Sequence, residues 1–408
     1  MSRMQASTFP MLDVAEAAEL VLERTRRLET ERVHVGSAYG RVLGEDLLVE
    51  EDLPRFPASA VDGFAVRSED GPGRRRLIGE SAAGRPFAGS VGRGEACRTL
   101  TGAVLPSGAD CMVMVEDTVQ GPDWVEVGAN LRPGANYHPP GSDARRGQVA
   151  VAAGTELRGA EIGIAATLGH AELTVVRRPL VAVLSTGDEL VEVGTRPGPG
   201  QIVDSNRWAL TAAVREAGAD VTLLGIGPDE EGPLRELVTG ALRDHDVLVT
   251  SGGVSVGSHD LVKPLLASLG EVLVGRVRLK PGKPFTFATL PGGRRAFGLP
   301  GFPVSSLVTF EVFVRPALRK MQGFSALQRP RLQVRLGYDA RPAPDRTEYQ
   351  RVVLRREGSN LIALTTGGQS SSRLLSAVGA QALVRVSPGE AAIRAGTMVE
   401  AIVLDLPA

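Results

Sequence analysis

The sequence predicts a multidomain protein that combines a doubly wound α/β domain with a helical N-terminal domain, an inserted β domain and a C-terminal β-barrel. Its length of 408 residues exceeds that of one ordinary domain. Strand and helix patterns alternate between residues 179 and 328, whereas short apolar runs broken by glycine and proline fill the segments before and after. The predicted domains are 1–50 together with 146–178 (helical), 51–145 (inserted β), 179–328 (α/β) and 329–408 (β-barrel).

Composition excludes several classes of protein. The hydrophobic content of 43% and charged content of 23% are typical of a soluble globular protein. A formal net charge of -1 and an aromatic content of 4% argue against binding to nucleic acid or to an anionic membrane. The chain has no apolar run long enough for a bilayer and no signal-peptide core. Two cysteines, Cys97 and Cys111, indicate a reducing compartment, so we expect a cytoplasmic protein.

The N-terminal domain is predicted from two helical patterns that lie far apart in the chain. Apolar residues recur at helical spacing over residues 13–28, with Asp13 as a suitable N-cap. A second helical pattern covers residues 156–170, and Gly169 is typical of a helix end. The all-β pattern between them predicts that the β domain is inserted into this helical domain.

Two polar positions of the inserted β domain are of interest. Asp62 precedes Gly63 immediately before a predicted strand, and Thr101 follows another apolar run in a Thr-Gly pair. An aspartate before glycine most often only hydrogen-bonds within its own turn, and this interpretation of Asp62 remains open.

The α/β region is organised around the loop that follows the predicted strand 246–250. This strand breaks into Ser251, Gly252 and Gly253, and a helical pattern begins at Leu261. Glycines let backbone N–H groups converge on an anion, and a helix N-terminus adds partial positive charge. The loop lacks the Gly-Lys-Ser/Thr of a P-loop and the spacing of a dinucleotide loop, so a turn required only for backbone geometry is the alternative.

Acidic residues follow successive strands of the predicted sheet. Glu189 follows the strand 179–186, Asp229 follows the strand 220–226, and Asp260 ends the glycine loop. Ligands of open α/β sheets bind at the carboxyl ends of the strands, where Pro300 and Gly301 also belong. Carboxylates beside a phosphate site are typical of Mg²⁺ binding. Each acid alone could be a solvated loop residue, but their positions at successive strand ends favour a function.

Cationic side chains near this edge suit an oxyanion. Lys280 and Lys283 flank a Pro-Gly turn that holds both at a fixed spacing. Exposed turn lysines are the common alternative, but the apolar strand after the turn favours a position of this segment against the core. Arg351 precedes a strand of the predicted β-barrel. A serine cluster around Ser371 and Ser372 is more typical of a solvated turn than of a nucleophile, because no histidine lies near it in sequence.

The motifs together resemble the molybdopterin molybdenumtransferases, a family that also includes the E domain of gephyrin. The resemblance covers essentially the whole chain and is specific because the motifs occur together. They are Ser59-Ala-Val-Asp-Gly-Phe-Ala65, Thr101-Gly-Ala103, Ser185-Thr-Gly-Asp-Glu-Leu190, Asp204-Ser-Asn206, Thr250-Ser-Gly-Gly-Val-Ser-Val-Gly257, Lys280-Pro-Gly-Lys-Pro284 and Gly298-Leu-Pro-Gly301.

This resemblance implies an elongated homodimer that hydrolyses adenylylated molybdopterin, with Mg²⁺ and molybdate, to molybdenum cofactor and AMP. It implies a molybdopterin-binding α/β domain and handover of the substrate from a molybdopterin adenylyltransferase. Glu189, Asp229 and Asp260 would hold Mg²⁺ and position the attacking water. By motif position, the catalytic residues would be Asp62, Thr101, Glu189, Asp229 and Asp260, and the substrate-binding residues Ser251, Gly252, Gly253, Lys280, Lys283, Pro300, Pro303, Arg351 and, more loosely, Ser372.

Two departures from the family pattern remove polar groups near the inferred cleft. Pro57 and Ala58 replace a polar pair, and Phe302 replaces the asparagine of Gly-Leu-Pro-Gly-Asn-Pro. They favour one alternative to an active enzyme, a gephyrin-like scaffold or paralogue with reduced or lost turnover. A third interpretation is a pterin or nucleotide binding module without chemistry, which would bind the adenylylated ligand but release nothing.

Overall fold

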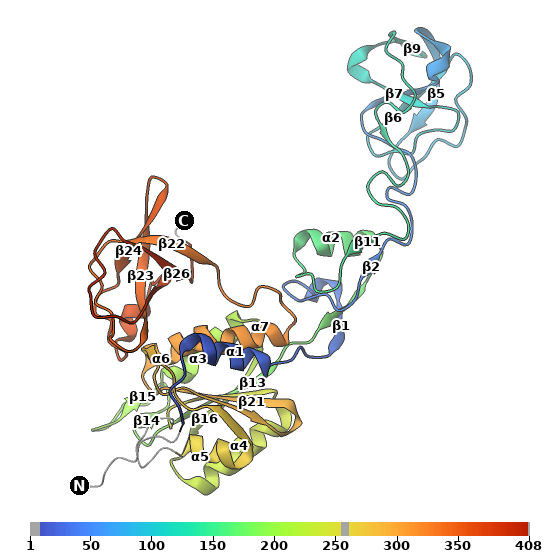
Figure 1. Ribbon diagram of the computed structural model, residues 1–408. Coiled ribbons are helices and arrows are strands. Elements are labelled where there is room, and N and C mark those ends of the chain that lie inside the picture. Colours follow the sequence, from blue (N-terminus) through green and yellow to red (C-terminus); the bar gives the residue numbers. More distant parts are fainter. Residues whose placement is uncertain (1–8, 254–260, 407–408) are drawn as a thin grey trace, which may run out of the picture. The chain divides into compact units, whose positions relative to one another are not determined.

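The computed structural model describes all residues except 1–8, 254–260 and 407–408 (Figure 1). Its contacts separate the chain into two units. The first contains the chain up to Arg32, Gly40–Val42 and everything from Thr174 onward, and the second contains Val33–Tyr39 and Leu43–Leu173. Each unit is therefore described by itself.

The first unit is built on a six-stranded sheet with the order β16-β13-β17-β21-β20-β18. The first four strands are parallel, as predicted, but β20 runs antiparallel to both of its neighbours, β21 and β18. Only residues 291–293 join β20 to β21, and a crossover to a parallel strand needs a much longer connection. The strands are β13 (Leu180–Thr186), β16 (Asp220–Gly227), β17 (Val247–Ser251), β18 (Glu271–Val274), β20 (Thr286–Leu290) and β21 (Arg294–Leu299).

Helices cover both faces of this sheet, which confirms the doubly wound arrangement (Figure 1). Alternate side chains of β13 point to opposite faces, so Val181 and Val183 join one core while Ala182 and Leu184 join the other. One face of the sheet carries α1 (Val14–Glu23), α3 (Asn206–Glu216) and the continuous helix formed by α6 (Pro303–Thr309), a π-helical turn (Phe310–Val314) and α7 (Arg315–Met321). The other face carries α4 (Glu231–Asp244) and α5 (Val262–Leu269).

None of the described helices is long and apolar enough to cross a membrane.

Helix α1 begins after Asp13, as predicted, but it ends at Glu23 instead of near residue 28. Its residues Val14, Ala17 and Val21 are buried in the same core as α3 and α7. The second predicted helix, α2 (Gly159–Thr167), belongs to the other unit. The apolar stripe of α1 is therefore satisfied by the α/β core, and the two predicted helices do not share one core.

The second unit is mostly β-structure, with a six-stranded sheet of order β7-β4-β6-β5-β9-β8. Two short antiparallel ladders join the outgoing and returning chain, which confirms that this β-structure is inserted. Its sheet contains β4 (Gly63–Val66), β5 (Gly73–Ser81), β6 (Glu95–Thr99), β7 (Cys111–Met114), β8 (Thr118–Gln120) and β9 (Trp124–Val127). The two ladders pair β2 (Leu47–Leu48) with β11 (Val149–Val151) and β3 (Ala58–Ser59) with β10 (Tyr137–His138). A further pair is formed by β1 (Thr30–His34) and β12 (Glu172–Val176).

The C-terminal strands form the predicted β-barrel. The ladder β23-β24-β22-β26-β25 is closed because β23 also pairs with β25. A short strand of the α/β region, β19 (Leu279–Lys280), adds to β23 in parallel and so brings the lysine turn against the barrel. The barrel strands are β22 (Arg331–Leu336), β23 (Thr347–Glu357), β24 (Asn360–Thr365), β25 (Ala382–Val386) and β26 (Met398–Val403).

An ion pair holds the amino ends of the neighbouring strands β13 and β17. Asp246, just before β17, accepts hydrogen bonds from Arg177 Nη1 and Nη2 at 2.6 and 2.7 Å and from the Leu180 N–H at 2.8 Å. Burial raises the pKa of Asp246, but these hydrogen bonds outweigh burial and leave the pKa below its ordinary value. The carboxylate therefore stabilises the fold only while it is ionised.

Replacing this carboxylate should give a pH-dependent loss of stability. Asp246→Asn should lower the free energy of unfolding by about 2 kcal/mol at neutral pH, because the Arg177 guanidinium loses one of its two carboxylate partners and keeps only Glu29. Since the folded pKa is lowered, the stabilisation is present above the unfolded pKa of about 3.9 and is lost as pH falls through the folded pKa. Urea unfolding of both proteins from pH 7 downward checks this.

Asp220→Asn is the matched control. The Asp220 side chain is mostly exposed and lies 3.7 Å from Arg178, so its removal should change the free energy of unfolding by less than about 0.5 kcal/mol. Equal effects of the two substitutions, or a difference between wild type and Asp246→Asn that does not shrink at low pH, would contradict the assigned role.

Candidate functional site

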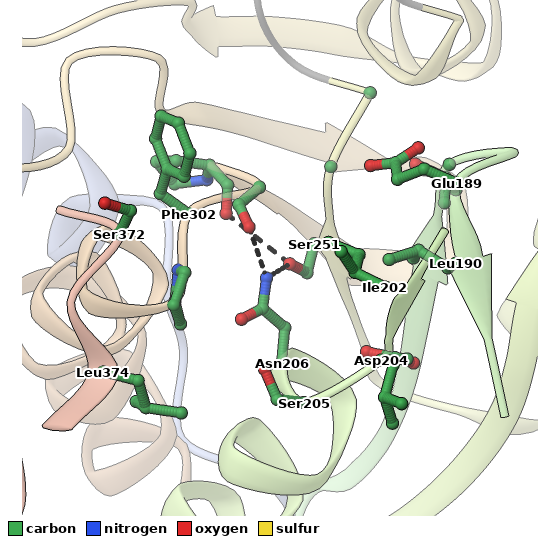
Figure 2. Close-up of a pocket in the computed structure, with 18 of the residues that line it drawn as sticks. Glu189, Leu190, Ile202, Asp204, Ser205, Asn206, Ser251, Phe302, Ser372 and Leu374 are labelled. Atoms are coloured by element: carbon green, nitrogen blue, oxygen red, sulfur yellow. Dashed lines mark hydrogen bonds between the residues drawn. The ribbon is translucent and has the colours of Figure 1, made fainter. Parts of the chain in front are cut away.

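A cleft of about 560 Å³ lies at the carboxyl ends of the parallel strands (Figure 2). The strand register explains its position, because Ser251 pairs with Ser185 of β13 on one side and Leu299 of β21 on the other. The three strands therefore end at the same edge of the sheet. Eight of the predicted site residues line this cleft: Glu189, Asp229, Ser251, Gly252, Gly253, Pro300, Pro303 and Ser372.

The glycines of the cleft floor are required by the backbone. Gly252 has φ +92°, and a Cβ there would lie 2.4 Å from the Thr186 carbonyl oxygen. A Cβ on Gly253, at φ +63°, would lie 2.6 Å from Val262 Cγ2. The Gly252 N–H donates to the Leu299 carbonyl at 3.1 Å, so it is already used within the sheet. The prediction that this N–H binds a ligand therefore disagrees with the structure. Of the three predicted binding groups of this loop, the Ser251 hydroxyl and Gly253 remain candidates.

Two of the three predicted metal-binding acids reach the cleft. Glu189 and Asp229 both line it, and the Asp188 N–H lies 3.4 Å from Asp229 Oδ2, which links their two loops. Asp260 lies outside the described residues. In the part of the chain that the structure describes, no group of three or more His, Cys, Asp or Glu side chains is arranged to hold a metal.

A second cavity of about 640 Å³ shares a wall with this cleft, formed by Glu189, Ile202, Pro284 and residues 300–302. It extends to the Lys280–Pro284 turn and to the serine loop, which we define as residues 367–374. The shared wall makes the two cavities one continuous binding region.

Three cationic side chains line the second cavity. Lys280 Nζ lies 3.1 Å from Glu348 Oε2, its register partner across β19 and β23. Arg346, which the sequence analysis missed, lies 3.3 Å from Asp345. Lys283 is exposed, and no ion pair joins it to the described residues. The cavity therefore offers positive charge, part of which is balanced by acids of the barrel.

Arg351 lines neither cavity, in contrast to its predicted contact with the ligand. It is 1% exposed and donates to Ser376 Oγ at 3.0 Å and to the Ser370 carbonyl at 3.3 Å through Nη2. Burial lowers the pKa of Arg351, while the Glu348 carboxylate opposes this change. These contacts give Arg351 a role in holding the serine loop.

The comparisons with known proteins agree with this architecture. Residues 12–169 match the MoeA N-terminal region (domain I and II), residues 182–320 a probable molybdopterin binding domain, and residues 333–404 the MoeA C-terminal region (domain IV). A molybdopterin molybdenumtransferase of Nostoc sp. strain PCC 7120 is 36% identical, over 98% of this chain and 94% of the relative. The chain belongs to the molybdopterin molybdenumtransferase family.

Two further similarities agree with this family assignment. A gephyrin of Dictyostelium discoideum is 34% identical over 98% of this chain, and the chain spans 63% of the length of that gephyrin. The solved structure of the molybdopterin biosynthesis MoeA protein from Pyrococcus horikoshii OT3 superposes with a TM-score of 0.83, at 28% identity, over 97% of this chain and all of that one.

The two predicted catalytic residues of the second unit contact each other. Asp62 Oδ1 accepts from the Thr101 N–H at 2.7 Å and from the Thr101 hydroxyl at 2.8 Å. These hydrogen bonds lower the pKa of Asp62, and both residues are exposed. The Asp62 side chain thus binds a residue 39 positions away, so it does more than close its own turn.

Phe302, a departure from the family pattern, lies on the wall shared by the two cavities and is 59% exposed. Figure 2 shows it near Ser372, across the cleft from Glu189. It is the N-cap of α6, where the phenyl ring cannot accept a hydrogen bond as asparagine would. The Ser371 carbonyl accepts from the Val304 N–H at 3.1 Å, so the serine loop caps this helix in place of the N-cap side chain.

Substitution of Gly252 should damage the cleft floor. Gly252→Ala should lower the free energy of unfolding by about 2 kcal/mol or more, because alanine is strained at this positive φ and its Cβ would contact the Thr186 carbonyl. Gly240→Ala is the control, since Gly240 lies within α4 with open space at its Cβ. There we expect stabilisation by about 1 kcal/mol. Urea unfolding of both variants is the measurement, and a neutral Gly252→Ala would contradict the packing.

Proposed function

We propose that this protein inserts molybdenum into molybdopterin, as its family relatives are named for doing. The observation that carries the proposal is the continuous binding region, in which a phosphate-type site with two carboxylates adjoins a cavity lined by cations. Such a region suits a ligand that has phosphate groups in one part and meets a second oxyanion in the other. Adenylylated molybdopterin and molybdate have this chemistry.

The substrate phosphates belong beside the strand ends. The Ser251 hydroxyl and the backbone of Gly253 line this part of the cleft. In the proposed reaction, water attacks the adenylate phosphorus, the P–O bond between the two phosphates breaks, and AMP leaves. Molybdate then binds through molybdenum to the dithiolene sulfurs of molybdopterin, as the new Mo–S bonds replace Mo–O bonds and the displaced oxygen leaves as water with the thiol protons.

The residues present fit a bound Mg²⁺ ion. Glu189 and Asp229 supply carboxylate oxygens, which Mg²⁺ prefers, at the wall of a phosphate site. Asp260 is the third proposed Mg²⁺ ligand, and this assignment rests on the sequence alone. When bound, the ion would neutralise charge on the phosphate oxygens, and the two carboxylates would fix its position.

Molybdate belongs in the second cavity. Lys280 and Lys283 provide ammonium groups on a fixed turn, and Arg346 adds a guanidinium. Arg351 acts here indirectly, since it holds the serine loop whose Ser371 lines the cavity. Molybdate is the substrate in this scheme, and in this cavity it would lie next to the molybdopterin end of the bound adenylate.

We further propose that the enzyme is a homodimer with shared sites, and that a molybdopterin adenylyltransferase hands over the substrate. The exposed Asp62–Thr101 pair is chemically suited to a polar ligand and lies in the other unit of the chain. A two-fold dimer can bring this pair to the cleft of its partner, which makes two equivalent sites.

The alternative is a gephyrin-like scaffold with reduced or lost turnover. Phe302 favours it, because an exposed aromatic ring on the shared wall replaces a polar amide. Pro57 and Ala58 lie in the second unit, where the Pro57 carbonyl accepts from the Leu105 N–H at 2.8 Å and Ala58 is part of β3. Molybdate-dependent turnover distinguishes the two functions.

An AMP-release assay tests the proposed activity. Purified protein should release AMP from adenylylated molybdopterin when molybdate and Mg²⁺ are present. Glu189→Gln and Asp229→Asn should each reduce the rate about tenfold or more, because each loses a negatively charged oxygen that would hold the metal. Asp188→Asn, in the same loop but outside the cleft lining, should keep the rate. Absence of AMP release would contradict the proposed activity, and binding of the adenylate without release would support a binding module without chemistry.

Mixed dimers test the shared site. Asp62→Ala and Asp229→Ala should each be inactive as homodimers. In a mixed dimer with shared sites, one site receives both lesions and the other receives neither, so activity should recover to about half of the wild-type value. Co-expression with two different tags isolates the mixed species. A mixed dimer without activity would place each site within one chain and leave Asp62 a structural role.

A further inference from the structure

Asn206 joins three segments at the floor of the cleft, although its sequence motif carried no assigned role. It is the first residue of α3, and its Nδ2 donates to Ser251 Oγ and to the Gly301 carbonyl, each at 2.7 Å (Figure 2). It thereby connects the start of a helix, the end of β17 and the loop after β21.

The neighbouring residue Asp204 fixes the start of α3. Asp204 is buried, accepts from the Ser185 hydroxyl at 3.0 Å and lies 3.1 Å from Arg207 Nε. Ser185 belongs to β13, so this network ties the helix to the sheet on one side of the cleft. Asn206 is consequently held in place by contacts other than its own amide.

The orientation of the Asn206 amide follows from its partners. The Gly301 carbonyl can only accept a hydrogen bond, so the amide nitrogen must face it and the amide oxygen must point away. That oxygen, Oδ1, is buried and has no hydrogen-bond partner among the described residues. An unsatisfied buried acceptor costs free energy. The amide therefore does not adopt this orientation in order to satisfy all of its own hydrogen-bonding groups.

The amide also determines what the Ser251 hydroxyl can do. Since Ser251 Oγ accepts from Asn206, its own proton remains to be donated. Among the described residues, the acceptors within reach are distant: the Pro300 carbonyl lies at 3.5 Å and Ser306 Oγ at 3.4 Å. Hydroxyl hydrogen bonds are usually near 2.8 Å, so a phosphate oxygen in the cleft would be a better acceptor.

We propose that Asn206 is a positioning residue that directs the Ser251 hydroxyl proton toward a phosphate oxygen of the substrate. This inference rests on the proposed function, because it requires a phosphate in the cleft. Asn206 acts by donating a hydrogen bond to Ser251 Oγ, so that the hydroxyl hydrogen stays available, while it holds the Gly301 peptide with the same nitrogen. A carboxylate at this position would do the opposite and accept the hydrogen bond of the hydroxyl.

The test is a double-mutant cycle with AMP as the probe. Asn206→Asp keeps the shape of the side chain but turns it into an acceptor, so AMP binding measured by calorimetry should weaken about tenfold. The same substitution in a Ser251→Ala background should have little further effect, because the hydroxyl that it misdirects is gone. Simple repulsion between the introduced carboxylate and the phosphate would persist in both backgrounds, so an equal loss overturns the proposal.

Two controls accompany the cycle. Asn360→Asp makes the same chemical change in the barrel hairpin of β23 and β24 and should leave AMP affinity unchanged. If Asn206→Asp does not fold, as judged by circular dichroism, Asn206→Ala enters the same cycle and should show coupling of the same sign. Wild-type protein that fails to bind AMP overturns this proposal together with the phosphate site. Wild-type binding with additive effects of Asn206 and Ser251 overturns the Asn206 role alone.

Discussion

The parallel register of β13, β17 and β21 is the constraint on which the site depends. Because Ser251 pairs with residues of both neighbouring strands, the loops that follow all three strands begin at the same edge. At the opposite edge, the Arg177–Asp246 ion pair holds the amino ends of β13 and β17. A one-residue shift in either pairing would separate the carboxylates from the serine and also turn the core side chains of that strand to the other face.

Much of this arrangement could be predicted from the sequence, because buried parallel strands and amphipathic helices have clear periodicities. Glu189, Asp229 and Ser251 come together for the general reason that strand ends in α/β sheets meet at one edge. The antiparallel direction of β20 is harder to predict from the sequence, since it depends on the short connection at residues 291–293. The end of α1 is hard to predict as well, because it depends on which core buries the helix.

Side-chain partners could not be predicted, because they join positions far apart in the chain. Lys280 is paired with Glu348 only because β19 adds to the barrel strand β23. Arg351 is buried with Ser376, a contact that no local pattern announces. The role of Asn206 depends on Gly301, 95 residues away. Sequence motifs thus predicted residues that line the cavities, whereas tertiary pairing decides which polar side chains are free to face them.

The serine loop shows how a departure from the family pattern is accommodated. It is held on one side by Arg351, which donates to the Ser370 carbonyl, and on the other by the Val304 N–H, which donates to the Ser371 carbonyl. The second contact serves α6 where Phe302 lacks a capping side chain, so the loop satisfies the helix end that asparagine would otherwise satisfy. The loop therefore links the barrel to the α/β domain beside both cavities. Since Ser371 lines the second cavity and Ser372 the first, the loop that caps α6 also contributes hydroxyl groups to the binding region.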